Sequence, residues 1–430
     1  MVTGGICSRP LLLFALAAWP GAAWAAEPLT LAEAQRLALA SSPTAGIAQA
    51  RLDKAQAVRG AAWAALFPSL TFAGTYTRRL QDSEFNGRTV QLADALRADL
   101  SLDLTVFDAR ALAILSATGK SQEAQALESD ELRRTLSFSV AAAYYAVLSA
   151  DSLTSAASRR REAAETTARE AAARFAAGLA AKNDVTRTEL EWAVARQEES
   201  TTRAAVARAR LALGVLVGLE SLGDRPLSEP PPLGPTPTAD LEAAALAGRQ
   251  DLAALGKRTE QLGALADEPL YRLIPTLSLR GLLFATNEQG VAGRTLDGNI
   301  SATLTWRLFD GGLRYADLAS RRADVREAEY RAEDARTRVR QEVRGARISL
   351  DEARATLELA ELRTRVAEQN AEEVRALFAS GLAGALEQVD AAVAEYEARA
   401  SLARQKVAVR VAELSVLAAL GSWPGERINP

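Results

Sequence analysis

The sequence RFAAGLAAKNDV at residues 174–185 returns in altered form as LFASGLAGALEQVD at residues 377–390. In both stretches a long run of helix-forming residues stops at Gly-Leu and restarts beside acidic residues. Glycine adopts the positive φ at which a helix can end and its chain reverse. Each stretch therefore predicts the tip of a helical hairpin, with Gly178 and Gly381 in the two turns.

Two further pairs of landmarks recur at almost the same spacing as the tips. Phe-Asp begins at Phe107 and again at Phe309, and a proline opens a strand-like stretch at Pro68 and again at Pro275. Three pairs at spacings of 202 to 207 residues indicate a tandem duplication, in which each repeat has an opening helix, two strands and a long helical hairpin. The predicted organisation is a signal peptide (1–26), a first structural repeat (27–220), a Pro-rich linker (221–239), a second structural repeat (240–421) and a C-terminal tail (422–430).

The N-terminus has the pattern of a secretory signal peptide. Arg9 precedes the apolar run LLLFALAAW, and small residues permit cleavage near Ala25 or Ala26. The run is too short to span a bilayer, and a short buried helix is the alternative interpretation. Cleavage would remove Met1 and Cys7, so we expect the exported chain to contain no Met, Cys or His.

These absences restrict the chemistry of the exported chain. Without Cys and His it has no thiolate nucleophile, histidine base, Ser-His-Asp triad or Cys/His zinc site. We expect no enzyme activity, no cofactor and no metal. We also expect no lipid anchor, because Cys7 precedes the apolar run instead of following it. The net charge is −3 and no basic block is present, which excludes nucleic acid as a partner.

Four stretches alternate between apolar and polar residues with the period of a β-strand. In DLSLDLTVF at residues 99–107, apolar residues form one face, and polar residues that include Asp99 and Asp103 form the other. The other three stretches are SLTFAGTYT, TLSLR and NISATLTWRLF. Sheets of soluble proteins also alternate in this way. Because four strands cannot close a barrel and an export signal precedes them, the pattern favours a membrane β-barrel shared by several chains, with Asp99 and Asp103 facing its lumen.

The longest helical patterns cover residues 111–175 and 313–378, each about 65 residues or roughly 100 Å long. They are longer than a bilayer is thick and too charged to cross one, so we expect them to project into an aqueous compartment. The returning helix at 182–216 is shorter by about 30 residues, a length that the opening helix of the repeat can supply by stacking end to end. Two heptad rows mark the second long helix: Val343, Leu350, Leu357, Thr364 and Ala371, and Ala346, Ala353, Ala360, Ala367 and Val374.

In their order and duplication, these motifs resemble the TolC-like outer membrane efflux proteins. The resemblance covers essentially the whole chain after the signal peptide and rests on LTLAEAQRLAL, FPSL and IPTL, WRLFDGG and the two tip stretches. It implies a mainly α fold with a membrane β-barrel portion, in which a homotrimer closes a twelve-stranded barrel and a helical tunnel into the periplasm. The implied function is that of a passive exit duct in a tripartite efflux or type I secretion system. The implied partners are outer-membrane lipid, a periplasmic adaptor protein and an inner-membrane transporter of the RND or ABC type.

The resemblance also assigns a role to the tips. It implies that Gly178, Leu179, Gly381 and Leu382 form the surface on which the adaptor docks. The alternative is a purely structural turn closed by an apolar contact, and both roles can hold at once. We expect Asp at Leu179 or Leu382 to weaken docking without dissolving the trimer.

In the same family, the helix after the second turn carries two acidic residues that ring the closed entrance. The corresponding positions are Glu387 and Asp390, and carboxylates from three chains would repel one another and attract cations. Ordinary solvated helix residues are the alternative. Ala383 and Phe378 stand where the family often has a basic residue and a tyrosine that latch the entrance. We therefore expect the closed entrance to rest on other contacts.

Two other classes of protein compete with the duct. A periplasmic coiled-coil adaptor or scaffold would share the export signal and the helical hairpins, but it would have no use for four amphipathic strands. An exported hydrolase built on Asp99 and Asp103 would need a nucleophile, a base and an oxyanion site, and the sequence orders none around them.

Overall fold

The structure is a computed structural model that describes residues 28–85, 87–219, 222–223, 225–231, 240–288 and 294–423. The predicted signal peptide, most of the predicted tail and part of the linker lie outside the described residues. The first repeat contains α1 (Leu31–Ser41), α2 (Pro43–Ala64), β1 (Ser69–Arg78), β2 (Ser83–Phe85), β3 (Arg88–Gln91), β4 (Asp94–Phe107), α3 (Ala109–Ala176) and α4 (Lys182–Val217). The second contains α5 (Leu241–Gly248), α6 (Gln250–Ala266), α7 (Glu268–Tyr271), β5 (Thr276–Thr286), β6 (Leu296–Thr305), α8 (Leu313–Ser380) and α9 (Ala385–Leu420).

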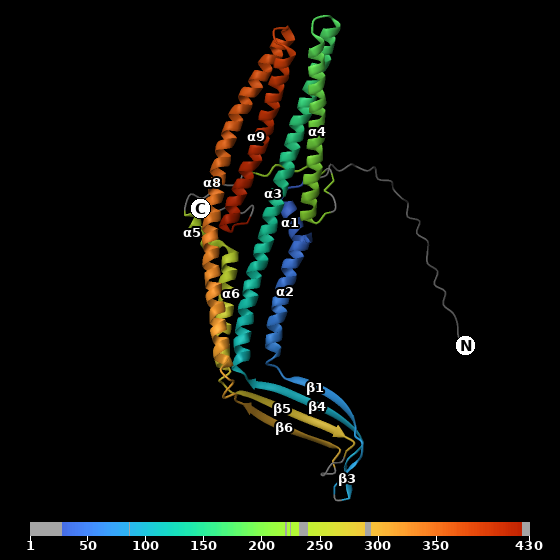
Figure 1. Ribbon diagram of the computed structural model, residues 1–430, viewed down its shortest axis with the longest axis vertical. Helices are drawn as coiled ribbons and strands as arrows, with labels where there is room; N and C mark the ends of the chain where they lie inside the picture. The colour runs from blue at the N-terminus through green and yellow to red at the C-terminus, as the bar shows by residue number, and fades with distance from the viewer. Residues whose placement is uncertain are drawn as a thin grey trace, which may run out of the picture.

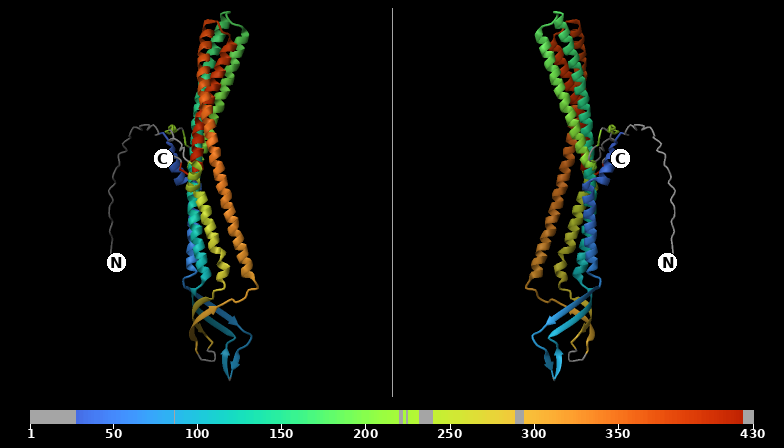
Figure 2. Two further views of the ribbon diagram at one scale, coloured as in Figure 1. Left: turned by 90° about the vertical axis from the view of Figure 1, so that its left-hand side faces the viewer. Right: turned by 90° about the vertical axis from the view of Figure 1, so that its right-hand side faces the viewer.

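Two helical hairpins stand on one end of a sheet, and both tips lie at the far end from the sheet (Figures 1 and 2). The outgoing helices α3 and α8 have 68 residues each, or about 100 Å, as predicted. The returning helices α4 and α9 have only 36 residues each. In Figure 1, α2 continues below α4, and α6 continues below α9. The predicted end-to-end stacking is therefore confirmed.

A hydroxyl and a proline shape the join between the stacked helices. Ser41, the last residue of α1, lies with its hydroxyl 2.7 Å from the carbonyl oxygen of Val217, the last residue of α4. Ser42 caps α2, and Pro43 occupies the first position of that helix. Proline is favoured there because it has no amide hydrogen to lose and its φ already suits a helix. The chain therefore makes a short bend between α1 and α2.

Small and apolar side chains fill the seams between the helices. All ten predicted heptad positions of α8 are buried or half-buried. On α3, Val140 and Tyr144 pack with Leu213 of α4, and Tyr145 packs with Leu414 of α9. Among the described helices, only α3 contains an 18-residue segment apolar enough to cross a membrane by composition, and 44% of that segment is buried within the chain. The core accounts for this composition.

The sheet has the order β1-β4-β5-β6, and every neighbouring pair is antiparallel. All four predicted strands are present. The short hairpin of β2 and β3 was not predicted, because three or four residues are too few to show a period. Within the described residues, β1 and β6 are the two edge strands of the four-stranded sheet.

The helices have open edges as well. In the upper half, α8 contacts α9, α9 contacts α3 and α3 contacts α4. Figure 1 shows α8 and α4 on opposite sides of this row. The sheet therefore has open edges at β1 and β6, and the helical portion has open edges at α4 and α8. In each case the first edge belongs to the first repeat and the second edge to the second repeat.

Candidate functional site

Both tips adopt the same turn. The amide of each tip glycine donates to the carbonyl three residues earlier, and the amide of the next leucine donates to the carbonyl five residues earlier. This pair of bonds closes a helix end with a residue of positive φ, and φ is 74° at Gly178 and 79° at Gly381. The hairpin turns predicted from Gly-Leu are therefore where the helices reverse.

The leucines that follow the glycines project away from the turns. Leu179 and Leu382 are each 79% exposed, so neither is packed as an apolar closure of its own turn. An exposed leucine gains no stability from burial within the single chain, but it would be buried if a partner protein covered it. The docking role of both leucines and of Gly178 and Gly381 stays a prediction.

Glu387 has a local role that the sequence analysis did not assign. Its Oε2 accepts a hydrogen bond of 2.9 Å from the amide of Gly384, at the start of α9. Asp184 makes the equivalent contact of 3.2 Å with the amide of Ala181 at the start of α4. Each carboxylate accepts a hydrogen bond from a backbone amide at the helix start and interacts favourably with the positive end of the helix dipole. Asp390 is exposed, and the predicted acidic ring depends on other copies of the chain.

The two tips touch each other through Arg174 and the Phe378 segment. The guanidinium of Arg174, at the end of α3, lies 4.3 Å from the centre of the Phe378 ring on α8. Its Nη2 also donates to the carbonyl oxygen of Ala379 at 3.3 Å. Phe378 is only 5% exposed. A cation over an aromatic face is attracted by the ring quadrupole, so Phe378 holds the tips together without a hydroxyl.

A second link joins the hairpins farther from the tips. Arg160 of α3 lies 4.8 Å from the ring centre of Tyr396 on α9 and forms an ion pair of 2.8 Å with Glu191 of α4. The Tyr396 hydroxyl donates to Glu198 of α4 at 3.0 Å. Burial and this hydrogen bond raise the pKa of Tyr396 to about 12. The hydroxyl therefore remains a donor throughout the neutral range.

The strand carboxylates are paired rather than free. Asp99 accepts from Nε of Arg97 at 2.7 Å, and Asp103 pairs with Arg280 of β5. Arg97 also lies 4.1 Å from the centre of the Phe284 ring. Neither Asp is arranged with a nucleophile among the described residues. The hydrolase hypothesis gains nothing from this geometry.

The comparisons with known proteins bear on the whole chain. The sequence profile of the family described as outer membrane efflux protein matches residues 35–219 and 241–422. The chain belongs to this family. The two matched segments correspond to the two repeats, and the predicted linker lies between them. The family is a transport family of the outer membrane, which confirms the predicted location and the predicted role in efflux.

Solved structures share the fold with this outer membrane efflux protein. The outer membrane protein VceC from Vibrio cholerae is 22% identical, with a TM-score of 0.76 over 91% of this chain and 96% of its own. The CmeC outer membrane channel of Campylobacter jejuni is 16% identical, with a TM-score of 0.79 over 91% and 85%. The open state of the MtrE outer membrane channel of Neisseria gonorrhoeae is 18% identical, with a TM-score of 0.78 over 91% and 89%. No curated protein matches the sequence at a significant level.

Proposed function

We propose that three copies of this chain close into a ring and form the exit duct of an efflux or type I secretion system. The matching open edges carry this proposal. A strand edge left open is a site for pairing with another chain, and β1 and β6 are such edges within the described residues. Head-to-tail pairing of β1 with β6 of the next copy gives a closed cyclic assembly.

The helical edges fit the same arrangement. Val194 of α4 lies 16 residues after Gly178, and Val366 of α8 lies 15 residues before Gly381. Both are exposed, and both lie roughly 24 Å from their tips. Leu211 and Ile348 form a second exposed pair, each 33 residues from its tip glycine. In the ring, apolar residues of α4 would meet apolar residues of α8 at equal heights.

One face of the sheet suits lipid. Every second residue of a strand points to this face, and its exposed apolar side chains include Leu70, Phe72, Leu100, Leu102 and Ile300. The opposite face carries the ion pairs of Asp99 and Asp103. Transmembrane barrels have apolar residues outside and polar residues inside. The two aspartates would then line the lumen as neutralised pairs, in contact with water.

The partners of the duct would bind at its periplasmic end. We expect a periplasmic adaptor to cover Leu179 and Leu382, and an RND or ABC-type transporter of the inner membrane to supply the energy. Glu387 and Asp390 would line the entrance in three copies, attracting cations. Such a duct moves its cargo passively and needs no catalytic group.

A disulfide between copies tests the ring. The single cysteine, Cys7, lies in the predicted signal peptide, so engineered cysteines meet no competing thiol in the exported chain. We expect Val194→Cys combined with Val366→Cys to give covalent dimers and trimers after oxidation of the outer-membrane fraction. These should survive heating on a gel and vanish on reduction, whereas the unmodified trimer should collapse on heating.

The matched control keeps one cysteine and moves the other. Val194→Cys combined with Ile348→Cys places the thiols at heights that differ by 17 residues, or about 25 Å, which is beyond the reach of a disulfide. This pair should stay monomeric on the heated gel. Equal cross-linking by both pairs, or none by the first in well-folded protein, would overturn the proposed contact of α4 with α8.

A further inference from the structure

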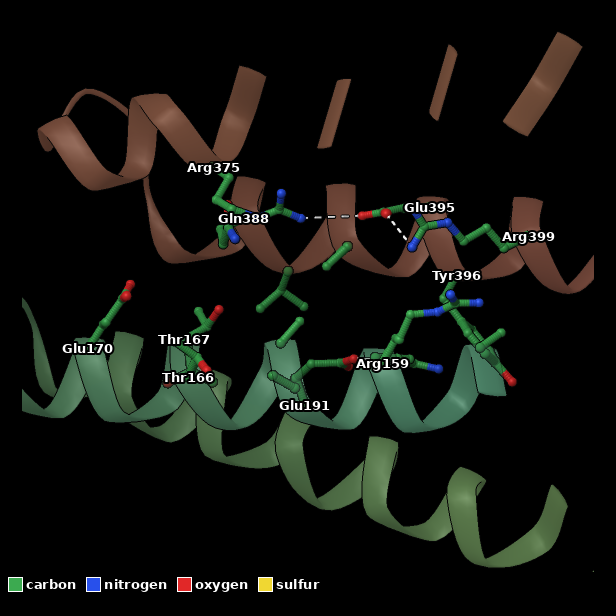
Figure 3. Close-up of a pocket in the computed structure, with 17 residues that line it drawn as sticks. Arg159, Thr166, Thr167, Glu170, Glu191, Arg375, Gln388, Glu395, Tyr396 and Arg399 are labelled. Carbon is green, nitrogen blue, oxygen red and sulfur yellow. Dashed lines mark hydrogen bonds and ion pairs between the residues drawn. The ribbon is translucent and has the colours of Figure 1, made fainter. Parts of the chain in front are cut away.

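A cavity of about 270 Å³ lies between the two hairpins of a single chain. Its long walls are α3 and α9, while α4 and α8 contribute only a few side chains. Figure 3 shows it in the space between these helices. The residues predicted to dock the adaptor and to ring the entrance do not line it.

Two acceptors without donors lie at one end of the cavity. Gln388 of α9 is 7% exposed, and its Oε1 is buried without a hydrogen-bond partner. Glu170 of α3 is exposed and lies at the same end (Figure 3), and it makes no hydrogen bond or ion pair with the described residues. A buried acceptor without a donor costs free energy, so Gln388 Oε1 favours a ligand that brings a hydrogen-bond donor. The unpaired carboxylate of Glu170 at the rim favours a ligand with a positive charge.

The arginines of the cavity do not oppose such a ligand. Arg160 is paired with Glu191, Arg375 is paired with Glu395, and Arg399 is paired with both Glu395 and Glu368. Within the described residues Arg159 has no partner, but it lies 11 residues from Glu170 on α3, or about 16 Å along the helix. Glu170, at the end that contains Gln388, is therefore a carboxylate without a counter-charge among the described residues.

Apolar atoms line the middle of the cavity, from Ala163 of α3 to Val389 and Ala392 of α9. We propose that the cavity binds a small organic cation, a protonated primary amine on an apolar body. The ammonium donates to Gln388 Oε1 and pairs with the Glu170 carboxylate, and the apolar body lies against Ala163, Val389 and Ala392. Because α3 and α9 belong to different hairpins, the ligand contacts both and holds them at this spacing.

The test is a fluorescence titration of the full-length protein in detergent with dansylcadaverine, a primary amine joined to an apolar fluorophore. Detergent micelles alone serve as the blank. We expect a saturable rise in emission with wild-type protein. Dansylamide, which has the same fluorophore without the ammonium, should give no saturable signal. The cavity belongs to one chain, so this result does not depend on whether the chain forms the proposed ring.

Three variants locate the binding. Gln388→Leu should weaken binding about tenfold, because it removes a charge-assisted hydrogen bond at a buried position. Glu170→Gln should weaken binding about threefold, because it removes an ion pair at an exposed position. Ala163→Leu should abolish binding by filling the cavity. The control is Glu372→Gln. Glu372 of α8 is exposed like Glu170 and lies at a similar distance from its tip glycine, nine residues against eight, but it does not line the cavity. Glu372→Gln should bind like the wild type.

Thermal unfolding of each variant shows whether its helices are intact. If well-folded Gln388→Leu and Glu170→Gln bind the probe as tightly as the wild type, the proposed site is wrong. It is also wrong if the wild type gives no signal above micelles, in which case water satisfies Gln388 and the cavity is only hydrated.

Discussion

Phe175 and Phe378 stand at equivalent positions, three residues before the two tip glycines, yet Phe175 is 45% exposed and Phe378 is 5% exposed. Their turns have the same hydrogen bonds and nearly the same φ, so the backbone is not the cause. The cause is the neighbouring chain segment. Arg174 of the first tip covers Phe378, whereas the residue equivalent to Arg174 in the second tip is Leu377. The turn is thus the same in both repeats, while the surroundings of its phenylalanine differ.

The largest difference between the tips should appear when the phenylalanines are truncated. Phe378→Ala removes a buried ring and its cation contact, and we expect a loss of about 3 kcal/mol in the stability of the helical portion. Phe175→Ala should cost under about 1 kcal/mol, because nearly half of this side chain is already in solvent. Unfolding followed by circular dichroism at the helical band measures both. Equal losses of unfolding free energy in the two variants would mean that the greater burial of Phe378 adds no stability.

The glycines should behave alike where the phenylalanines differ. A Cβ at Gly178 or Gly381 would meet no atom within 4 Å, so only the positive φ opposes a side chain. We expect Gly178→Ala and Gly381→Ala each to cost about 1 to 2 kcal/mol in the same unfolding measurement.

Gly345 is the matched control for the two tip glycines. A Cβ there also meets nothing within 4 Å, but the residue lies inside α8 with helical backbone. Gly345→Ala should therefore stabilise the helix by about 0.5 to 1 kcal/mol. A destabilising Gly345→Ala would show that added volume, not the positive φ, explains the effect at the tips.

The features that the sequence predicted are those in which a short segment determines its own structure. The tip turns need only a glycine at the helix end, and the seam of α8 needs only small residues at every third or fourth position. The alternation of β4 likewise identifies its two faces within one strand. Because the chain is duplicated, each of these local signals also appears twice, which strengthens the prediction.

The features that the sequence did not reveal join distant segments. Arg174 and Ala379 are 205 residues apart, and Tyr396 and Glu198 are 198 apart. No local pattern selects one arginine among many for such contacts. Asp103 is similar, since its partner Arg280 is 177 residues away. Asp99 is the exception, because Arg97 is two residues away on the same face of the strand and the ion pair could have been read directly.

Glu387 and Asp184 share a capping role, and variants of the two can separate it from the entrance role that is predicted for Glu387 alone. Glu387→Ala and Asp184→Ala should each cost about 0.5 to 1 kcal/mol, because each leaves a helix-terminal amide without its acceptor. Glu387→Gln and Asp184→Asn keep an acceptor and should cost less. In planar bilayers, Glu387→Gln should lower the preference of the duct for cations, while Asp184→Asn should not. If both variants changed the cation selectivity equally, Glu387 would have no role at the entrance that Asp184 lacks.

The exposed leucines should have the smallest effect on stability. Leu179→Asp and Leu382→Asp should each change the unfolding free energy by less than about 0.5 kcal/mol, because both side chains are already in solvent. Each should nevertheless reduce the amount of periplasmic adaptor that co-purifies with the trimer, since a charge in a covered apolar contact must be desolvated. Leu80→Asp is the control, because Leu80 is fully exposed and lies beside the sheet, at the opposite end of the chain from the tips. Adaptor recovery and export that are unchanged in both tip variants would leave the Gly-Leu turns with a structural role alone.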